Sequence, residues 1–297
     1  MKIETNNSYR NIFYITGKKN NEEKSYKINI KENPQDYSFA KNCTIPDPVS
    51  RTRLVSERYK LLKPLNKDEY TNLINKISSD DYTKNPPYVY IGEYKDTPLE
   101  FMGLVPYCGD KDIHNEINCW LTGRFHKGIA DVEDEKISNI VNALDYSLKR
   151  LDEKFGKYWG IVYRYGFFNP LTDKQYYSSS TSAYGALKFA IDAVPSKKHP
   201  YSIIKLKNGH SIYDFQKYAN NKYSKICADI EKEVLIDRKS KFRLIPEEEY
   251  TEEDLKLREK FLAIAVTDEE EVTQQDIKFA VEEYDDRLKY ISIWEEI

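Results

Sequence analysis

Three short segments of the 297-residue chain carry side chains whose types and spacing suit chemistry on a charged ligand. In the first, Arg164 lies near the end of the largely apolar run 159–165, which Gly166 follows. A strand end on a rigid scaffold presents its side chain to a cleft. A guanidinium there offers a pyrophosphate paired, charge-assisted hydrogen bonds. Taken alone, Arg164 is also compatible with an exposed strand end, which is the simpler interpretation.

The second segment is a run of small hydroxyl side chains that ends in Ser180, Thr181 and Ser182. Hydroxyl groups donate and accept hydrogen bonds with little bulk, which suits contacts to a ribose and the orientation of a catalytic acid. Strand periodicity predicts Ser180 and Ser182 on one face and Thr181 on the other. A polar Ser/Thr loop is the alternative interpretation of the same residues.

The third segment contains two glutamates, Glu231 and Glu233, at the start of an apolar run. On a strand their i, i+2 spacing places both carboxylates on one side, where Leu235 continues the face and Lys232 points away. Two carboxylates entering a buried strand repel each other and resist burial, so the pair is costly unless it has a use. A solvated strand end is the alternative.

In this order, an arginine, a Ser-Thr-Ser run and a Glu-x-Glu pair resemble the arginine–serine–glutamate clade of mono-ADP-ribosyltransferases. The flanks agree, because segment 112–121 looks like the Tyr/Asn-rich helix of that family and segment 208–212 like its strand-turn-strand. Arg238 and Phe242 fit its closing strands. The resemblance covers roughly residues 65–245. The chain departs from the pattern at Tyr165, which separates Arg164 from Gly166, and in a long segment between Gly209 and Glu231.

The resemblance implies that NAD is the co-substrate and that no metal is needed. Arg164 then binds the NAD phosphate region, and Ser180 contacts the nicotinamide ribose and orients Glu233. Glu233 hydrogen-bonds the ribose 2′-hydroxyl and stabilises positive charge at the anomeric carbon, as a glycosidase carboxylate does. Thr181 and Ser182 support the strand.

The same resemblance assigns Glu231 to the acceptor. A guanidinium must lose a proton before it attacks, and its high pKa calls for a positioned base. Glu-x-Glu in this family accompanies arginine acceptors, so transfer to a protein arginine is expected. Tyr184 or Phe189 is a candidate to pack against nicotinamide, and membership of a helix core is the alternative for both aromatics.

Hydrophobic periodicity predicts the elements that position these groups. Helices are expected around four apolar stripes and in a capped segment, with boundaries near residues 70–77, 113–121, 137–151, 250–267 and 273–291. Gly123 and Gly156 are expected to end the second and third of these helices, and Thr251 and Thr273 to cap the last two. Short strands are expected at 159–165, 175–182, 202–206 and 234–236, with a turn at Asn208-Gly209. Helices first and strands afterwards indicate an α+β class. The resemblance adds an ADP-ribosyltransferase-like fold, with two small, mostly antiparallel sheets packed around an NAD cleft.

Three regions are expected along the chain. Residues 1–60 form a hairpin, at 9–30, and an irregular arm; residues 61–245 form the catalytic domain; and residues 246–297 form an acidic helical C-terminal extension. No G-x-G-x-x-G or G-x-x-x-x-G-K-[ST] motif occurs, so a nucleotide site is of neither the Rossmann nor the P-loop type.

Charge and cysteine usage narrow the partners. Lys and Arg number 46 and Asp and Glu 49, a net charge of −3, so a nucleic-acid partner is not indicated. The four cysteines and four histidines show no zinc spacing, and a disulfide framework is not expected, which favours a reducing compartment. A membrane span of ~18 apolar residues is not found.

The sequence therefore predicts a transferase, specifically a glycosyltransferase, that modifies a host or partner protein. A free NAD glycohydrolase, or transfer to Thr, Gln or Asn, keeps the fold and changes the acceptor. A non-catalytic interaction protein on the same scaffold is the alternative from another class. The setting expected is a bacterial effector or toxin used in virulence. It would be secreted without a Sec signal and act in the host cytosol; a phage-encoded cytoplasmic modifier is the alternative.

Overall fold

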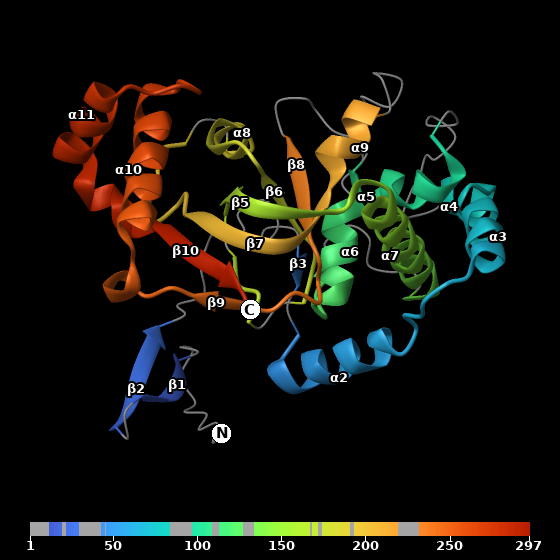
Figure 1. Ribbon diagram of the computed structural model, residues 1–297. Coiled ribbons are helices and arrows are strands. Elements are labelled where there is room, and N and C mark those ends of the chain that lie inside the picture. Colours follow the sequence, from blue (N-terminus) through green and yellow to red (C-terminus); the bar gives the residue numbers. More distant parts are fainter. Residues whose placement is uncertain are drawn as a thin grey trace.

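The computed structural model is a mixed α+β fold in which two groups of helices lie on opposite sides of a central sheet (Figure 1). It describes residues 12–19, 22–29, 43–44, 46–83, 97–108, 113–126, 134–166, 168–171, 174–190, 193–218 and 232–297. The α+β class predicted from the sequence is confirmed.

The first group of helices precedes the sheet in the chain. It consists of α2 (Pro48–Tyr59), α3 (Lys67–Ile77), α4 (Asp80–Thr83), the 3₁₀ helix η2 (Leu99–Leu104), α5 (Val105–Cys108), α6 (Ile113–Leu121) and α7 (Asp134–Phe155). Helices α6 and α7 are followed by Gly123 (φ 68°) and Gly156 (φ 79°). Glycine takes this left-handed conformation without a Cβ clash, which is why both helices end where the sequence predicts.

The central sheet has six strands in the order β5-β6-β8-β7-β10-β9. Their bounds are β5 (Lys157–Tyr165), β6 (Tyr177–Ser180), β7 (Tyr201–Ser211), β8 (Glu233–Ile236), β9 (Phe242–Leu244) and β10 (Ile291–Glu296). Strand β5 pairs with both β6 and β7, so strands β5, β6, β8 and β7 form a closed ring. The pairs are antiparallel except β7 with β10, which is parallel.

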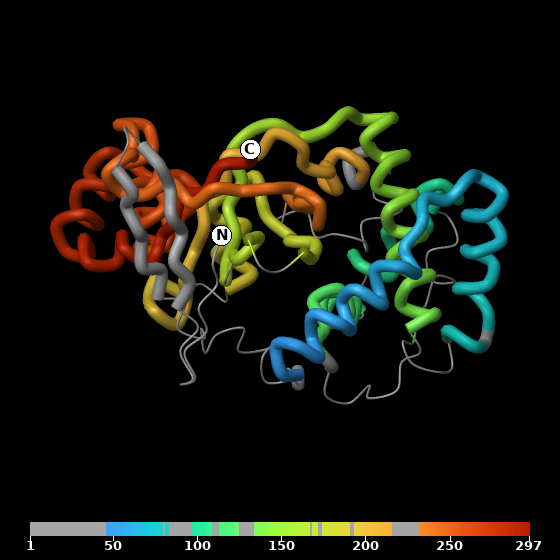
Figure 2. Tube along the Cα trace, turned by 90° about the horizontal axis from the view of Figure 1, so that it is seen from below, coloured from blue at the N-terminus to red at the C-terminus, as the bar shows by residue number. Residues whose placement is uncertain are grey.

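The second group of helices follows or interrupts the strands. It comprises α8 (Ala183–Lys188), α9 (Ile212–Tyr218), η3 (Glu247–Glu249), α10 (Glu252–Thr267), α11 (Gln274–Tyr284) and η4 (Asp285–Tyr290). Thr251 and Thr273 begin α10 and α11 with capping boxes, in which each threonine exchanges hydrogen bonds with an aspartate three residues on. Both helix starts were predicted. Figure 2 shows α10 and α11 at the opposite end of the molecule from the first helices. Helix α9 instead packs beside the first helices, where its Phe215 ring contacts Phe101 of η2.

Two further sheets have two strands each. Strands β1 (Ile12–Lys19) and β2 (Glu22–Asn29) pair antiparallel, which confirms the predicted hairpin. Strands β3 (Cys43–Thr44) and β4 (Phe125–His126) pair through Cys43 with His126 and Thr44 with Phe125.

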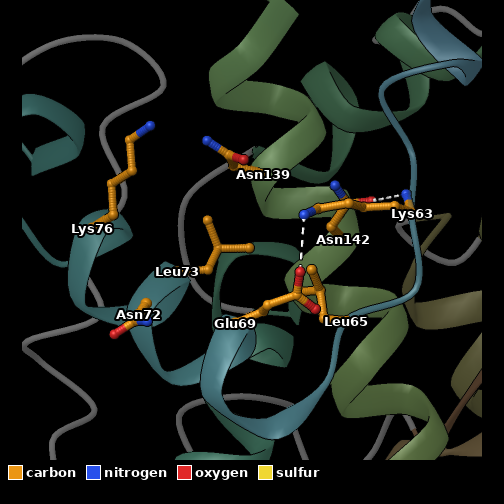
Figure 3. Close-up of a pocket in the computed structure, with 8 residues that line it drawn as sticks. All are labelled: Lys63, Leu65, Glu69, Asn72, Leu73, Lys76, Asn139 and Asn142. Carbon is orange, nitrogen blue, oxygen red and sulfur yellow. Dashed lines mark hydrogen bonds and ion pairs between the residues drawn. The ribbon is translucent and has the colours of Figure 1, made fainter.

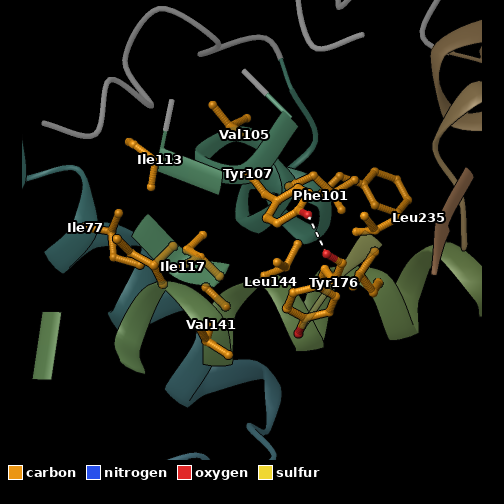
Figure 4. Packing of buried hydrophobic residues seen from close by; sticks show 14 of the residues in the cluster. Ile77, Phe101, Val105, Tyr107, Ile113, Ile117, Val141, Leu144, Tyr176 and Leu235 are labelled. Atoms are coloured by element: carbon orange, nitrogen blue, oxygen red, sulfur yellow. Dashed lines mark hydrogen bonds between the residues drawn. The ribbon is translucent and has the colours of Figure 1, made fainter. Parts of the chain in front are cut away.

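Three apolar clusters support the sheet. One lies under the first helices and reaches the sheet through Tyr176 and Leu235 (Figure 4). The second lies between α8, α10, α11 and the strands β7 and β10. The third fills the ring of strands, with Val162, Ile204 and Val234 at most 1% exposed. The sheet is therefore packed on both sides, which explains why the sequences of its strands are nearly continuous apolar runs.

Four expectations are corrected. The arm before residue 60 contains a capped helix, α2, which begins at Pro48 after the N-cap Asp47. The strands form one folded six-stranded sheet, not two packed sheets. Asn208-Gly209 is not a turn, because β7 continues through it. Its backbone is held there by the buried Glu296 carboxylate, which accepts from the amides of Lys207 (2.7 Å) and Asn208 (2.8 Å).

The fourth correction concerns the C-terminal end. Segment 246–297 was expected to be a helical extension, with the last helix reaching residue 291. Helix α11 ends at Tyr284 instead, and the final residues form β10, which pairs with β7 and β9. The alternation of Ile291, Ile293 and the following residues fits a strand equally well, and pairing with the edge of the sheet decides between the two.

Candidate functional site

The structure brings two of the predicted site residues directly together. Strands β6 and β8 pair antiparallel with Ser180 opposite Glu233. Residues that face each other across such a pair project to the same side of the sheet, about 5 Å apart at Cβ. Ser180 is fully buried and Glu233 is 6% exposed. A hydroxyl and a carboxylate, both withdrawn from water, therefore share one face at the end of two strands.

The residues after Ser180 leave the strand. Thr181 donates its amide to the carbonyl of Lys232 (3.1 Å), and Ser182 donates its amide to Ser180 Oγ (3.0 Å). Ser182 is then the N-cap of α8, and its Oγ accepts from the Gly185 amide (3.3 Å). The prediction that Ser180 and Ser182 share a strand face is therefore wrong, because helix capping requires Ser182 to turn out of the strand.

The second glutamate cannot be placed by strand periodicity. Strand β8 begins at Glu233, and Lys232 has a left-handed φ of 43°. The alternation that was expected to carry Glu231 to the side of Glu233 therefore stops at Lys232. Glu231 itself lies outside the described residues, so its predicted role stays a prediction.

Arg164 lies on the neighbouring strand but turns to another face. Its strand neighbour Tyr163 is the residue opposite Ser180, so alternation places the Arg164 side chain on the other side of β5. There its Nη1 donates to the Ser178 carbonyl (2.6 Å), and its guanidinium carbon lies 5.0 Å from the centre of the Tyr177 ring. Its Nε is buried without a hydrogen-bond partner. The structure thus places Arg164 beside β6 but does not join its guanidinium to Glu233.

The two candidate aromatics lie on or next to α8. Tyr184 packs against the second apolar cluster, and Lys188 Nζ lies 4.3 Å from the centre of its ring. Phe189 is the C-cap of the helix and is 40% exposed. Tyr184 is therefore partly buried against this cluster, as the helix-core alternative expects. Contact of either ring with nicotinamide stays a prediction.

The first helices hold the start of β6 from one side. Asn118 of α6 accepts from the Tyr176 amide (3.1 Å) and donates to the Tyr176 carbonyl (3.1 Å), as a neighbouring strand would. It also donates to Tyr107 Oη (3.2 Å), which donates to the same carbonyl (3.3 Å; Figure 4). Burial, with the negative charge of Glu233, raises the pKa of Tyr107, so the phenol remains protonated. Segment 112–121 was singled out in the sequence, but Asn118 was not.

A buried ionic network extends this support. Asp145 of α7 contacts Tyr176 Oη and accepts a hydrogen bond from Arg238 Nη2 (2.6 Å). Arg238 lies two residues after the end of β8. Burial, together with the nearby Asp145 charge, raises the pKa of Tyr176 well above its usual range. The network joins α7 to the residues that precede β6 and follow β8. It therefore fixes the two strands that carry Ser180 and Glu233 at their other ends.

A second charged group lies beside it. His210 Nδ1 is 2.8 Å from Asp152 of α7, and its Nε2 is 3.5 Å from Asp237. Burial alone lowers the pKa of His210, but the two carboxylates outweigh it and raise that pKa to about 9. Burial opposes ionisation of Asp237 too, yet its ion pair with His210 lowers its pKa to about 2. At neutral pH His210 is therefore an imidazolium between two carboxylates.

The sequence predicts no disulfide framework, and the structure adds one disulfide-bonded cysteine, Cys119 of α6. Spacing alone gave no sign of this bond, because a disulfide depends on the three-dimensional approach of two Cβ atoms and not on a short motif.

Other kinds of site were sought among the described residues. Within them, no group of three or more His, Cys, Asp or Glu side chains is arranged to hold a metal ion. Of the helices described, none has the length and apolar character that crossing a membrane requires. An open pocket of about 320 Å³ lies between α3 and α7, lined by Lys63, Leu73, Lys76 and Asn139 among others (Figure 3). Its lining includes none of the predicted site residues.

Comparison with known proteins gives no independent assignment. No protein-family model matches the chain, and no curated protein or solved structure does. The function must therefore be argued from the residues and their arrangement.

Proposed function

We propose that this protein is an NAD-dependent mono-ADP-ribosyltransferase with an ADP-ribosyltransferase-like fold. The observation that carries the proposal is the direct pairing of Ser180 with Glu233, both buried, at the ends of β6 and β8. The sequence motifs that contain these residues lie more than 50 positions apart, and the resemblance requires them to meet. A carboxylate kept dry beside a hydroxyl suits stabilisation of a developing cation, since electrostatic effects strengthen when water is excluded.

The reaction proposed for this pair requires few catalytic groups. Nicotinamide leaves NAD as a neutral group and needs no general acid, so the enzyme must stabilise positive charge at the anomeric carbon of the ribose. Glu233 supplies the negative charge and accepts from the ribose 2′-hydroxyl. Ser180 donates a hydrogen bond that orients either the carboxylate or the ribose.

Arg164 is proposed to bind the phosphates of NAD. Its buried Nε lacks a hydrogen-bond partner, and an unsatisfied buried donor is costly until an acceptor arrives. Its Nη1 already donates to the Ser178 carbonyl. Its side chain projects to the other side of β5 from Ser180, so NAD must pass the end of the strand to reach both groups. Binding the diphosphate then requires the guanidinium to exchange its bond to Ser178, or to share it.

The proposed acceptor is an arginine of a host or partner protein, with Glu231 as the base. Secretion as a bacterial effector or toxin that acts in the host cytosol is part of the proposal. A phage-encoded cytoplasmic protein is the second setting.

Release of nicotinamide from NAD, together with labelling of protein by an NAD analogue, tests the proposal. Glu233→Ala should abolish both while the far-UV circular dichroism stays unchanged. Loss of the label in hydroxylamine separates an arginine acceptor from Thr, Gln and Asn acceptors. Release without labelling instead indicates a glycohydrolase. Absence of NAD binding by calorimetry, with no release above the Glu233→Ala background, leaves an interaction protein and overturns the proposal.

A further inference from the structure

The loop between α10 and α11 contacts residues next to both strands of the candidate site. Glu270 Oε1 accepts from Lys232 Nζ (2.8 Å), immediately before β8, and from Ser182 Oγ (3.4 Å), shortly after β6. One carboxylate thus joins Ser182, two residues after Ser180, to Lys232, the residue before Glu233. Residue types alone do not predict this contact, because Glu270 is one of four consecutive acidic residues, 268–271.

The residue that Glu270 holds has an unusual backbone. Lys232 has φ 43°, a conformation that is strained for a residue with a Cβ and persists when neighbours fix it. Two contacts do so here. The Thr181 amide donates to the Lys232 carbonyl (3.1 Å), and Glu270 pairs with the Lys232 ammonium. The left-handed turn is therefore fixed at its main chain from β6 and at its side chain from the α10–α11 loop.

A second contact from the same loop holds α8. Asp268, the left-handed C-cap of α10 (φ 56°), accepts from Lys188 Nζ at 2.9 Å in the last turn of α8. Ser182, the N-cap of α8, is held by Glu270. Asp268 and Glu270, hereafter the acidic clamp, therefore bind α8 at both ends.

We propose that Glu270 is a positioning residue for the candidate site. It keeps Lys232 in its left-handed turn and ties that turn to Ser182, so that Glu233 enters β8 opposite Ser180. This inference rests on the proposed function, because Ser180 and Glu233 are its reacting groups. Glu270 touches neither of them and acts through Lys232 and Ser182.

The acidic clamp is tested by substitution of Glu270 beside a matched control. Glu270→Ala should lower kcat for nicotinamide release about three- to fivefold, the range set by a partly exposed ion pair. KM for NAD should change less than twofold, because the clamp does not contact Arg164. Glu269→Ala removes the preceding, exposed glutamate and should leave both constants unchanged. The charge swap Lys232→Glu with Glu270→Lys should restore most of the activity.

A double-mutant cycle separates positioning from a general loss of structure. Glycine takes φ 43° without strain, so in a Lys232→Gly background Glu270→Ala should have less than a twofold further effect on kcat. An equal effect of Glu270→Ala in both backgrounds contradicts the proposal, since Glu270 would then not act through Lys232.

Hydrogen exchange gives a readout that does not depend on activity. Glu270→Ala should speed exchange of the Thr181 amide about fivefold relative to Glu269→Ala, because that amide bonds to Lys232. If the wild type releases no nicotinamide but exchange changes in this way, the clamp stands and the proposed enzymatic function fails. If the wild type is active and the two variants agree in both kcat and exchange, the clamp fails and the enzymatic function stands.

Discussion

The two sides of the sheet hold the same pair of strands by different physical means. On the side of the first helices, Asn118 binds the backbone of Tyr176, and Asp145 joins Tyr176 to Arg238, all in buried or partly buried surroundings. On the side of the last helices, Glu270 and Asp268 act through ion pairs whose carboxylates are 54% exposed.

The two kinds of contact therefore have different roles: the buried contacts contribute to global stability, and the exposed contacts adjust the strand ends that carry Ser180 and Glu233. A buried ion pair leaves an uncompensated charge when one partner is lost, whereas an exposed pair is screened by water and salt. The ends of β6 and β8 distant from Ser180 and Glu233 are therefore fixed by the fold. The ends that carry these residues are held by contacts worth little to global stability, which can be tuned without unfolding the chain.

The largest effect is expected on the buried side. Arg238→Ala removes a side chain that is 4% exposed and leaves Asp145 without its main cation, so the free energy of unfolding should fall by about 3–5 kcal/mol. Urea denaturation measures this change. Lys188→Ala, the matched removal of a cation from the exposed side, should cost less than about 1 kcal/mol. Equal losses from the two variants would contradict the distinction between the two sides.

A smaller effect is expected from pH through His210. Its pKa is raised to about 9, so its contribution is fully present below about pH 6.5 and is lost as the pH rises towards 9. The loss should reach up to about 3 kcal/mol. Asp237 affects stability at acid pH. Its pKa is lowered to about 2, so its contribution to stability is lost as the pH falls from about 4 towards 2.

Urea denaturation at a series of pH values checks both effects. The free energy of unfolding of the wild type should fall between pH 6.5 and 9, and that of His210→Gln should change much less over the same interval. A wild-type stability that rises through this interval would show that His210 is not held as an imidazolium.

The sequence predicted local structure well where the signal is local. The apolar stripe of α7 and its stop at Gly156, and the capping boxes at Thr251 and Thr273, need only neighbours in the chain. The pairing of Ser180 with Glu233 followed only from the resemblance, because the two lie far apart in the chain and their register is set by the sheet.

Other features could not be predicted because partners far away in the chain determine them. Residues 291–296 became β10 through pairing with β7, and β7 passes through Asn208-Gly209 because Glu296 binds its amides. Ser182 was expected in a strand but is the N-cap of α8. The left-handed turn at Lys232, which ends the alternation before Glu231, has no signature in residue type, since lysine disfavours it.

The most direct test of the account is a cycle of nicotinamide release by the wild type, Ser180→Ala, Glu233→Gln and the double variant. If the paired residues act as a unit, Glu233→Gln should reduce kcat by about 10²-fold or more, and adding Ser180→Ala should cost little further. Release by Glu233→Gln at the wild-type rate would contradict the claim that this pair cleaves NAD.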